Sequence, residues 1–76
     1  MLVNLLGVSP VNFQSEQGQD VRGVSVYFSY PNTVAGAIGD ICERKFIKGA
    51  SVDSFALGVW DFDFNTKGQL ISFKEG

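Results

Sequence analysis

Residues 21–30 read VRGVSVYFSY, and this stretch decides the fold class because its side chains alternate in character. The apolar and aromatic set on one parity comprises Val24, Val26, Phe28 and Tyr30. Between Gly23 and Ser29 the other parity carries small or polar residues, with Tyr27 as the exception. A period of two places successive side chains on opposite faces of a sheet, so the stretch predicts a β-strand with one buried face. Pro31 and Asn32 end it, because proline lacks an amide donor and asparagine favours turns.

The segment before it, residues 2–14, predicts a first strand that is kinked or split in two. Its apolar run is interrupted at Gly7 and Pro10, which suits a bulge or bend in an edge strand. A polar turn at residues 15–20 separates it from the next strand. The run is short and has no basic flank, which predicts neither a signal peptide nor a membrane span.

Residues 33–48, TVAGAIGDICERKFIK, are compatible with two structures. Apolar residues at helical spacing, Thr33 as a cap and Gly49 as a stop favour a helix around residues 33–47. Against a helix, Gly36 and Gly39 each cost roughly 1 kcal/mol in a helix interior. The stretch CERKFIK also alternates as a strand does, so the helix is favoured and the strand stays open.

Residues 59–73, VWDFDFNTKGQLISF, predict a hairpin and not a metal site. Asp61, Asp63 and Asn65 alternate as the first ligands of a calcium-binding loop do. Neither frame, however, supplies both the glycine at the sixth position and the glutamate at the twelfth. The same period of two places the Trp60, Phe62 and Phe64 rings on one face of a strand and the two carboxylates on the other.

The turn NTKG leaves two registers open for this hairpin. A four-residue loop pairs Phe62 with Ile71 and Trp60 with Phe73, which puts the rings together. A three-residue loop with a glycine bulge shifts the pairing by one residue and sends Ile71 and Phe73 to the Asp side. Burial of the rings favours the four-residue loop.

The chain as a whole predicts one small β-rich domain spanning residues 1–76. Hydrophobic residues make up 45% of it, aromatic residues 13% and charged residues 18%, which is typical of a packed globule. The order strand, strand, possible helix, strand, strand predicts a mainly β fold of about five antiparallel strands. We expect an OB-like barrel, or alternatively an SH3-like barrel, with at most one helix around residues 33–47.

The composition argues against catalysis and against metal binding. The chain has no histidine and a single cysteine, Cys42, so it lacks an internal disulfide, a zinc ligand set and the commonest partner of a catalytic nucleophile. No phosphate-cradling glycine loop or dinucleotide motif occurs. We therefore expect no enzyme activity, no cofactor and no metal, and the lone thiol favours a cytoplasmic location.

Basic residues near aromatic side chains predict a binding surface. Three of the six Lys and Arg residues lie in RKFIK, residues 44–48, around Phe46. An exposed ring beside a local basic patch holds single-stranded nucleic acid by stacking and phosphate neutralisation. The predicted site residues are Arg22, Tyr27, Arg44, Lys45 and Lys48. The alternative is that the charges are an ordinary solvated surface and Phe46 is core, and the net charge of −2 is unlike that of most nucleic-acid-binding proteins.

Three stretches distributed over most of the chain carry a resemblance: VNFQSEQGQDVRGVSVYFSY, ERKFIK and FNTKGQLISF. The chain resembles small uncharacterised proteins of phages and conjugative elements in Gram-positive bacteria and, more loosely, the helix-destabilising proteins of filamentous phages. The resemblance implies a non-enzymatic module of a phage or mobile element that binds single-stranded DNA weakly. The alternative is a protein-interaction or homo-oligomeric assembly subunit that uses the edge strand near Pro10 or the aromatic face.

Overall fold

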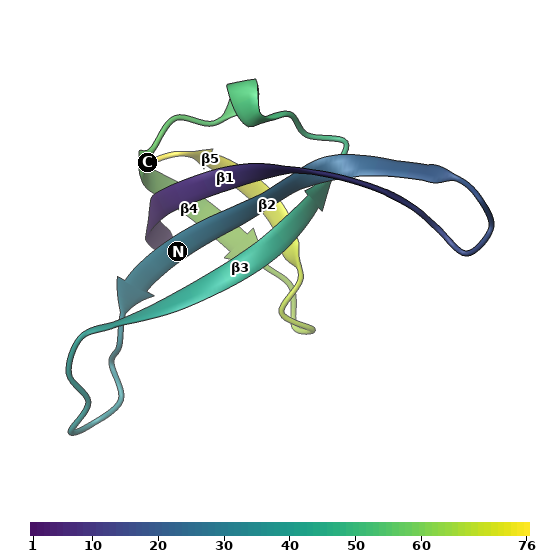
Figure 1. The fold of residues 1–76 in the computed structure, drawn as a ribbon. Helices are drawn as coiled ribbons and strands as arrows, with labels where there is room; N and C mark the ends of the chain where they lie inside the picture. Colours follow the sequence, from purple (N-terminus) through teal and green to yellow (C-terminus); the bar gives the residue numbers. More distant parts are fainter.

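A computed structural model describes all of residues 1–76. Its five strands, whose side chains alternate between the two faces, form one antiparallel sheet (Figure 1). The strands are β1 (Leu2–Gln14), β2 (Asp20–Pro31), β3 (Asp40–Lys48), β4 (Gly58–Phe64) and β5 (Leu70–Glu75). One 3-10 turn, η1 (Val52–Ser54), lies between β3 and β4. The prediction of a mainly β protein with about five antiparallel strands is confirmed.

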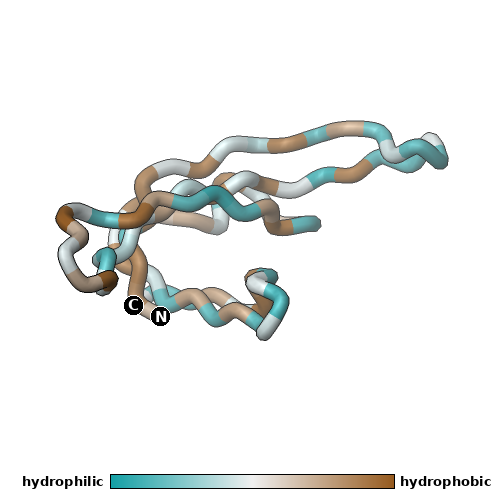
Figure 2. The backbone as a smooth tube through the Cα atoms, turned by 90° about the horizontal axis from the view of Figure 1, so that it is seen from below, coloured by the Kyte–Doolittle hydropathy of each residue, from teal (hydrophilic) through white to brown (hydrophobic).

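The strands lie side by side in the order β3-β2-β1-β4-β5. β1 pairs with β2 along most of its length, but with β4 only over residues 2–5, so the sheet divides beyond that point. Figure 2 shows the β1–β2 and β4–β5 hairpins on opposite sides of the resulting bend. Closure into an OB-like or SH3-like barrel is not seen, because the two end strands, β3 and β5, do not pair with one another.

The core lies on the inner face of this curled sheet. Phe28 of β2 packs edge-on against Phe62 of β4 with ring centroids 5.1 Å apart, which joins the two sides of the bend. Phe55 covers Trp60 at 5.2 Å, and the Trp60 indole N–H donates to the Ala56 carbonyl at 2.7 Å. The buried hydrophobic residues are Val3, Leu5, Val24, Val26, Phe28, Trp60 and Phe62.

The kink expected in the first strand is present as a β-bulge. The register of β1 against β2 shifts between Leu5 and Gly7, which leaves Leu6 as the extra residue. Pro10 does not interrupt the strand, which continues to Gln14. It lies where β1 has already separated from β4, so its missing N–H costs no ladder hydrogen bond on that side.

The helix favoured for residues 33–47 is wrong. Gly36 and Gly39 have φ angles of 83° and 85°, a left-handed backbone that no α-helix can contain. Asp40–Lys48 forms β3 instead and pairs with β2 along its whole length. Hydrogen bonds to the free edge of β2, together with partial burial of Ile47 against the core, outweigh a helix weakened by two glycines.

The β4–β5 hairpin forms as predicted, but the four-residue loop favoured for it is wrong. The Asn65 N–H donates to the Gln69 carbonyl at 3.0 Å, and Phe64 pairs with Leu70, which defines a three-residue loop. The Asn65 side chain stabilises this tighter turn, because its Oδ1 accepts the N–H groups of Lys67 and Gln69 at 3.0 and 2.9 Å.

A second irregularity returns the rings to the same face. The β4–β5 register shifts between Asp63 and Phe64, so Ile71 is an extra residue and Phe73 pairs with Phe62. The exposed Ile71 side chain is the consequence of this bulge. The prediction that burial keeps the rings together therefore holds, although by a bulge and not by the length of the loop.

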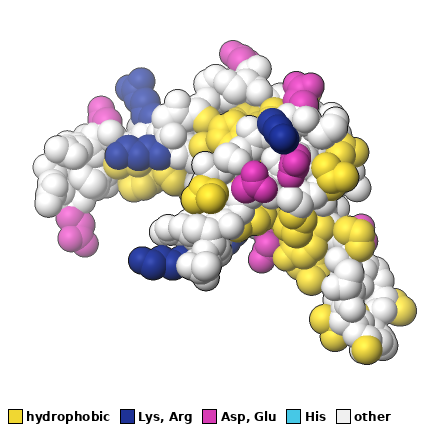
Figure 3. Space-filling model, turned by 180° about the vertical axis from the view of Figure 1, so that it is seen from behind, with side chains coloured by type: hydrophobic (Ala, Val, Ile, Leu, Met, Phe, Trp, Pro, Cys, Tyr) yellow, Lys and Arg dark blue, Asp and Glu magenta, His cyan; other side chains and the backbone are white.

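Two projections give the molecule an extended shape, with principal extents of 47 × 25 × 18 Å (Figure 1). They are the β1–β2 end around residues 15–19 and the loop at residues 32–39. The radius of gyration is 13.9 Å, against about 11 Å for a compact domain of this length. Only 10 of the 76 residues are buried, and Figure 3 shows hydrophobic side chains at the tip of the 32–39 loop, where Ile38 is 95% exposed. None of the helical structure has the length and apolar character that a membrane crossing needs.

Candidate nucleic-acid interface

The outer face of β2 is lined with small side chains, and Tyr27 stands out among them. Gly23, Ser25 and Ser29 on this face are all buried, whereas Tyr27 is 38% exposed. The Tyr27 ring lies towards Gly7 of β1, where a Cβ atom would be 3.8 Å from its Cδ2. Because these neighbours are small, the Tyr27 ring is the one aromatic ring on the outer face of β2 that solvent can reach.

Two further rings lie on the same outer face. Phe46 of β3 covers Gly23, since a Cβ atom there would be 2.9 Å from Phe46 Cζ. Phe13 of β1 is tilted against Phe46 with centroids 6.1 Å apart. Both rings are about half exposed, so the alternative in which Phe46 belongs to the core is wrong. We call Phe13, Tyr27 and Phe46 the outer aromatic patch.

Two cationic side chains accompany this patch. Arg44 is the cross-strand partner of Tyr27, and Lys48 is the partner of Gly23, so both lie on the outer face. Neither forms an ion pair within the chain. Beside the Phe13 and Phe46 rings lies an open hollow of about 490 Å³, lined by Val11, Phe13, Ser25, Arg44, Lys45 and Phe46.

The other two predicted site residues lie towards the inner face. Lys45 pairs with Val26, and its Nζ lies 6.0 Å from the centroid of the Phe64 ring. Arg22 pairs with Asn12 on the inner side of the arm and lines a separate hollow with residues 50–52. Neighbouring positions on a strand point in opposite directions, which separates Lys45 from Arg44. The structure thus groups Tyr27, Arg44 and Lys48 on the outer face and sets Arg22 apart, whereas Lys45 lines the hollow beside Phe46 but directs its ammonium towards Phe64.

The carboxylates of the predicted hairpin are engaged elsewhere, on the outer side of β4. The Met1 α-ammonium contacts Asp61 Oδ1 at 2.8 Å and Asp63 Oδ1 at 3.8 Å. The hydrogen bond from that ammonium lowers the pKa of Asp61, burial opposes this by raising it, and the positive charges of Met1 and Lys74 lower the pKa further. The Ser72 hydroxyl donates to Asp63 at 2.9 Å. These acidic groups belong to β4, two strands away from β2 in the sheet.

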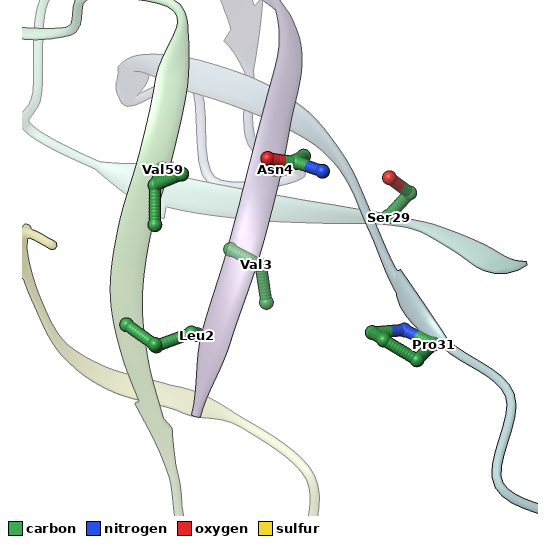
Figure 4. A pocket seen from close by; sticks show the side chains of 6 residues that line it. All are labelled: Leu2, Val3, Asn4, Ser29, Pro31 and Val59. Atoms are coloured by element: carbon green, nitrogen blue, oxygen red, sulfur yellow. The ribbon is translucent and has the colours of Figure 1, made fainter.

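A smaller hollow of about 240 Å³ lies over the start of β1, and Figure 4 shows its lining. Its residues are Leu2, Val3, Asn4, Ser29, Pro31 and Val59. None of these side chains carries a charge or a basic nitrogen, so the hollow offers no pair of groups for acid–base chemistry. No set of three or more His, Cys, Asp or Glu side chains is placed to hold a metal ion.

The sequence-based prediction missed Phe13 as a member of the patch. The alternation of β1 could have identified it. Phe13 and Val11 lie on the same face of β1, and the polar turn at residues 15–20 places that face beside the outer face of β2. Phe13 of β1 meets Phe46 of β3 across β2 only because residues 40–48 form a strand, and the sequence left that open.

Comparison of the chain with known protein families, with curated proteins and with solved structures finds no match.

Proposed function

We propose that this protein is a non-enzymatic module that binds single-stranded nucleic acid weakly through the outer aromatic patch, Arg44 and Lys48. The observation that carries the proposal is the direct pairing of Tyr27 with Arg44 across β2 and β3. Bases stack on exposed rings, while a neighbouring guanidinium neutralises the phosphate backbone and stacks on bases itself.

The charges of the site predict weak binding with a shallow salt dependence. Arg44 and Lys48 offer two cations on the outer face, and the whole chain carries a net charge of −2. Neutralising about two phosphates of a single strand gives a logarithmic salt slope of roughly −1.4. Stacking is insensitive to base identity, so the binding is expected to tolerate many sequences. Arg22 lies outside this surface, and Lys45 lines its hollow but directs its ammonium towards Phe64, so both contribute less.

The proposal includes a setting: the cytoplasm of a cell that carries a phage or mobile element. Its support is the resemblance of three stretches of the chain to small proteins of such elements. The single Cys42, which is free and exposed, is compatible with a reducing compartment.

Fluorescence anisotropy of a labelled oligothymidylate of about 20 nucleotides tests the proposal. At about 50 mM salt the anisotropy rises with protein concentration, and added salt reverses the rise with the slope given above. Double-stranded DNA of the same length is the comparison, because its stacked bases are closed to the rings. Equal binding of the duplex, or no binding of the single strand at low salt, contradicts the proposal.

A second candidate function, a homo-oligomeric assembly subunit, is favoured by a different observation. Besides the rings of the outer aromatic patch, four aliphatic side chains are each at least half exposed: Leu2, Leu6, Val59 and Ile71. Isolated surface hydrophobics are ordinary, but a domain with so few buried residues gains stability by covering them with another copy. Sedimentation at increasing concentration separates a monomer from an assembly.

A further inference from the structure

β3 is an edge strand whose outward hydrogen-bonding groups are open over nine residues. The direction of these groups follows from the two bonds that flank the strand. The Gly49 N–H donates to the Arg22 carbonyl at 2.8 Å and the Asn32 N–H to the Gly39 carbonyl at 3.4 Å. Both bonds keep the β2–β3 register, so odd-numbered residues of β3 bond to β2. The even-numbered residues therefore direct their N–H and C=O groups to the open edge: Asp40, Cys42, Arg44, Phe46 and Lys48.

The sequence of this edge, DICERKFIK, is complementary to itself in the antiparallel direction. When the strand is placed against a second copy with Arg44 on the twofold axis, every residue except Arg44 itself meets a suitable partner. The facing pairs are Asp40 with Lys48, Ile41 with Ile47, Cys42 with Phe46 and Glu43 with Lys45. We propose that two copies of this chain pair through β3 in this register and join their sheets into one.

The hydrogen-bonding pattern removes the registers that are shifted by one residue. In an antiparallel ladder, residues that exchange hydrogen bonds face each other in pairs. An odd shift would place the outward-directed groups of even residues opposite odd residues, whose groups are already used by β2. An even shift keeps even residues opposite even residues. In the proposed register, the five facing pairs of even residues can form up to about ten backbone hydrogen bonds, two for each pair.

The charges remove the registers that are shifted by two residues. One such shift places Glu43 opposite Glu43 of the other copy, and the opposite shift places Lys45 opposite Lys45. Like charges directly across a ladder destabilise it, and opposite charges stabilise it. The proposed register has one like-charged pair, Arg44 with itself on the axis. Against it stand the ion pairs of Asp40 with Lys48 and of Glu43 with Lys45, each formed twice by symmetry.

The charged groups of β3 are free to make these pairs. No ion pair within the chain involves Asp40, Glu43, Lys45 or Lys48. Glu43 accepts a hydrogen bond from the Tyr30 hydroxyl through Oε2 at 2.9 Å, which leaves Oε1 available. Charged residues on an edge strand ordinarily prevent pairing with other strands. Here the same charges oppose a foreign strand and match a second copy.

This pairing also extends the outer surface. A twofold axis perpendicular to the sheet keeps outer faces on the same side, so the two outer aromatic patches become neighbours. The inference does not depend on nucleic-acid binding, because its tests contain no nucleic acid; it rests on the second candidate function, homo-oligomeric assembly, and names the strand that forms the contact.

Sedimentation velocity on the full chain, from about 10 µM to about 1 mM, is the first test, and a concentration-dependent dimer is expected. Glu43→Lys places two lysines opposite each other at each inner pair, and Lys45→Glu places two carboxylates there. Each single variant is expected to weaken the dimer about ten- to a hundredfold, and the double variant, which exchanges the charges, to restore it. Glu16→Lys and Lys67→Glu make the same changes of charge in the turns and are expected to leave the dimer unchanged.

A cross-link tests the register itself. In a Cys42→Ser background, Arg44→Cys places two thiols across the axis, where facing Cα atoms lie about 5.5 Å apart and a disulfide can form. Glu43→Cys in the same background faces Lys45 of the other copy and is the control. Rapid oxidation to a covalent dimer for position 44 only supports the proposal. A wild-type monomer throughout the concentration range, a dimer that ignores the charge exchange, or equal cross-linking at both positions overturns it.

Discussion

Tyr27 and Arg44 face each other across β2 and β3 on the outer side of the sheet, with no larger side chain of β2 beside them between Gly23 and Ser29. This pair places a ring and a guanidinium on one surface, and these are the two kinds of group on which the proposed binding of single-stranded nucleic acid depends. The pairing follows from two neighbouring strands with alternating side chains, so it needs no loop to hold it.

Tyr27→Ala and Arg44→Ala are each expected to weaken binding of a single-stranded oligonucleotide. Loss of the ring removes about 1–3 kcal/mol of stacking, whereas loss of the guanidinium makes the salt dependence shallower by about one phosphate. Anisotropy titrations at several salt concentrations measure both effects. Lys67→Ala in the β4–β5 turn is the control for Arg44→Ala, because it removes the same charge away from the patch. Equal effects of the two charge removals would count against the assigned surface.

Gly23→Ala is expected to destabilise the fold by roughly 1–3 kcal/mol, because overpacking forces the backbone to move. A Cβ atom at Gly23 would collide with the Ile47 carbonyl and with the Phe46 ring. Gly7→Ala is the matched control, since its added Cβ meets only Tyr27 Cδ2 at 3.8 Å. Urea unfolding followed by tryptophan fluorescence gives both free energies, and equal losses for the two variants would contradict the described packing.

The inner and outer rings are expected to differ sharply in their contribution to stability. Phe62→Ala removes a fully buried ring at the centre of the core and should cost about 3–5 kcal/mol, enough to unfold a domain of this size. Phe46→Ala removes a ring that is 42% exposed and should cost less. Circular dichroism melting curves compare them, and a Phe46→Ala variant as unstable as Phe62→Ala would place Phe46 in the core.

The Tyr30–Glu43 hydrogen bond predicts a loss of stability in alkaline solution. The bond to Glu43 raises the pKa of Tyr30, and partial burial and the negative charge of Glu43 raise it further. A pKa that is higher in the folded state gives a stabilisation that is complete below the unfolded value of about 10 and is lost as pH rises through the folded value.

Tyr30→Phe is expected to remove that alkaline component and to flatten the profile of unfolding free energy above about pH 9. Tyr27→Phe leaves the Tyr30–Glu43 bond in place and is the control. Urea titrations at a series of pH values measure both profiles. If Tyr30→Phe keeps the full alkaline loss of the wild type, the hydrogen bond does not cause it.

The strands of this protein were largely predictable because period-two alternation is a local property. VRGVSVYFSY and VWDFDF each carry a buried face that only a strand can produce, and both are strands in the structure. Residues 40–48 were not predictable in this way, because their apolar spacing fits a helix as well as a strand. The edge of β2 decided the outcome, and it is not visible from the segment itself.

The candidate site was predictable only in part, for a related reason. Arg44 and Lys45 are adjacent in sequence, and a strand sends them to opposite faces, whereas a helix would have kept them nearer to one another. The bulge at Ile71 was likewise not predictable from the turn sequence, because the bulge places Phe73 opposite Phe62 and beside the Phe55 and Trp60 rings. The sequence indicated that basic and aromatic residues form the candidate surface. Which of these residues share one face depends on how the strands pair.

The most direct test of the central claim is a nuclear magnetic resonance titration of the isotopically labelled protein with an unlabelled oligothymidylate. The account predicts that the amide shifts which change are concentrated around Phe13, Tyr27, Arg44, Phe46 and Lys48. Amides of β4 and β5, near Asp61 and Asp63, are expected to remain unchanged. Changes confined to β4 and β5, or none at an excess of oligonucleotide at low salt, would contradict the claim.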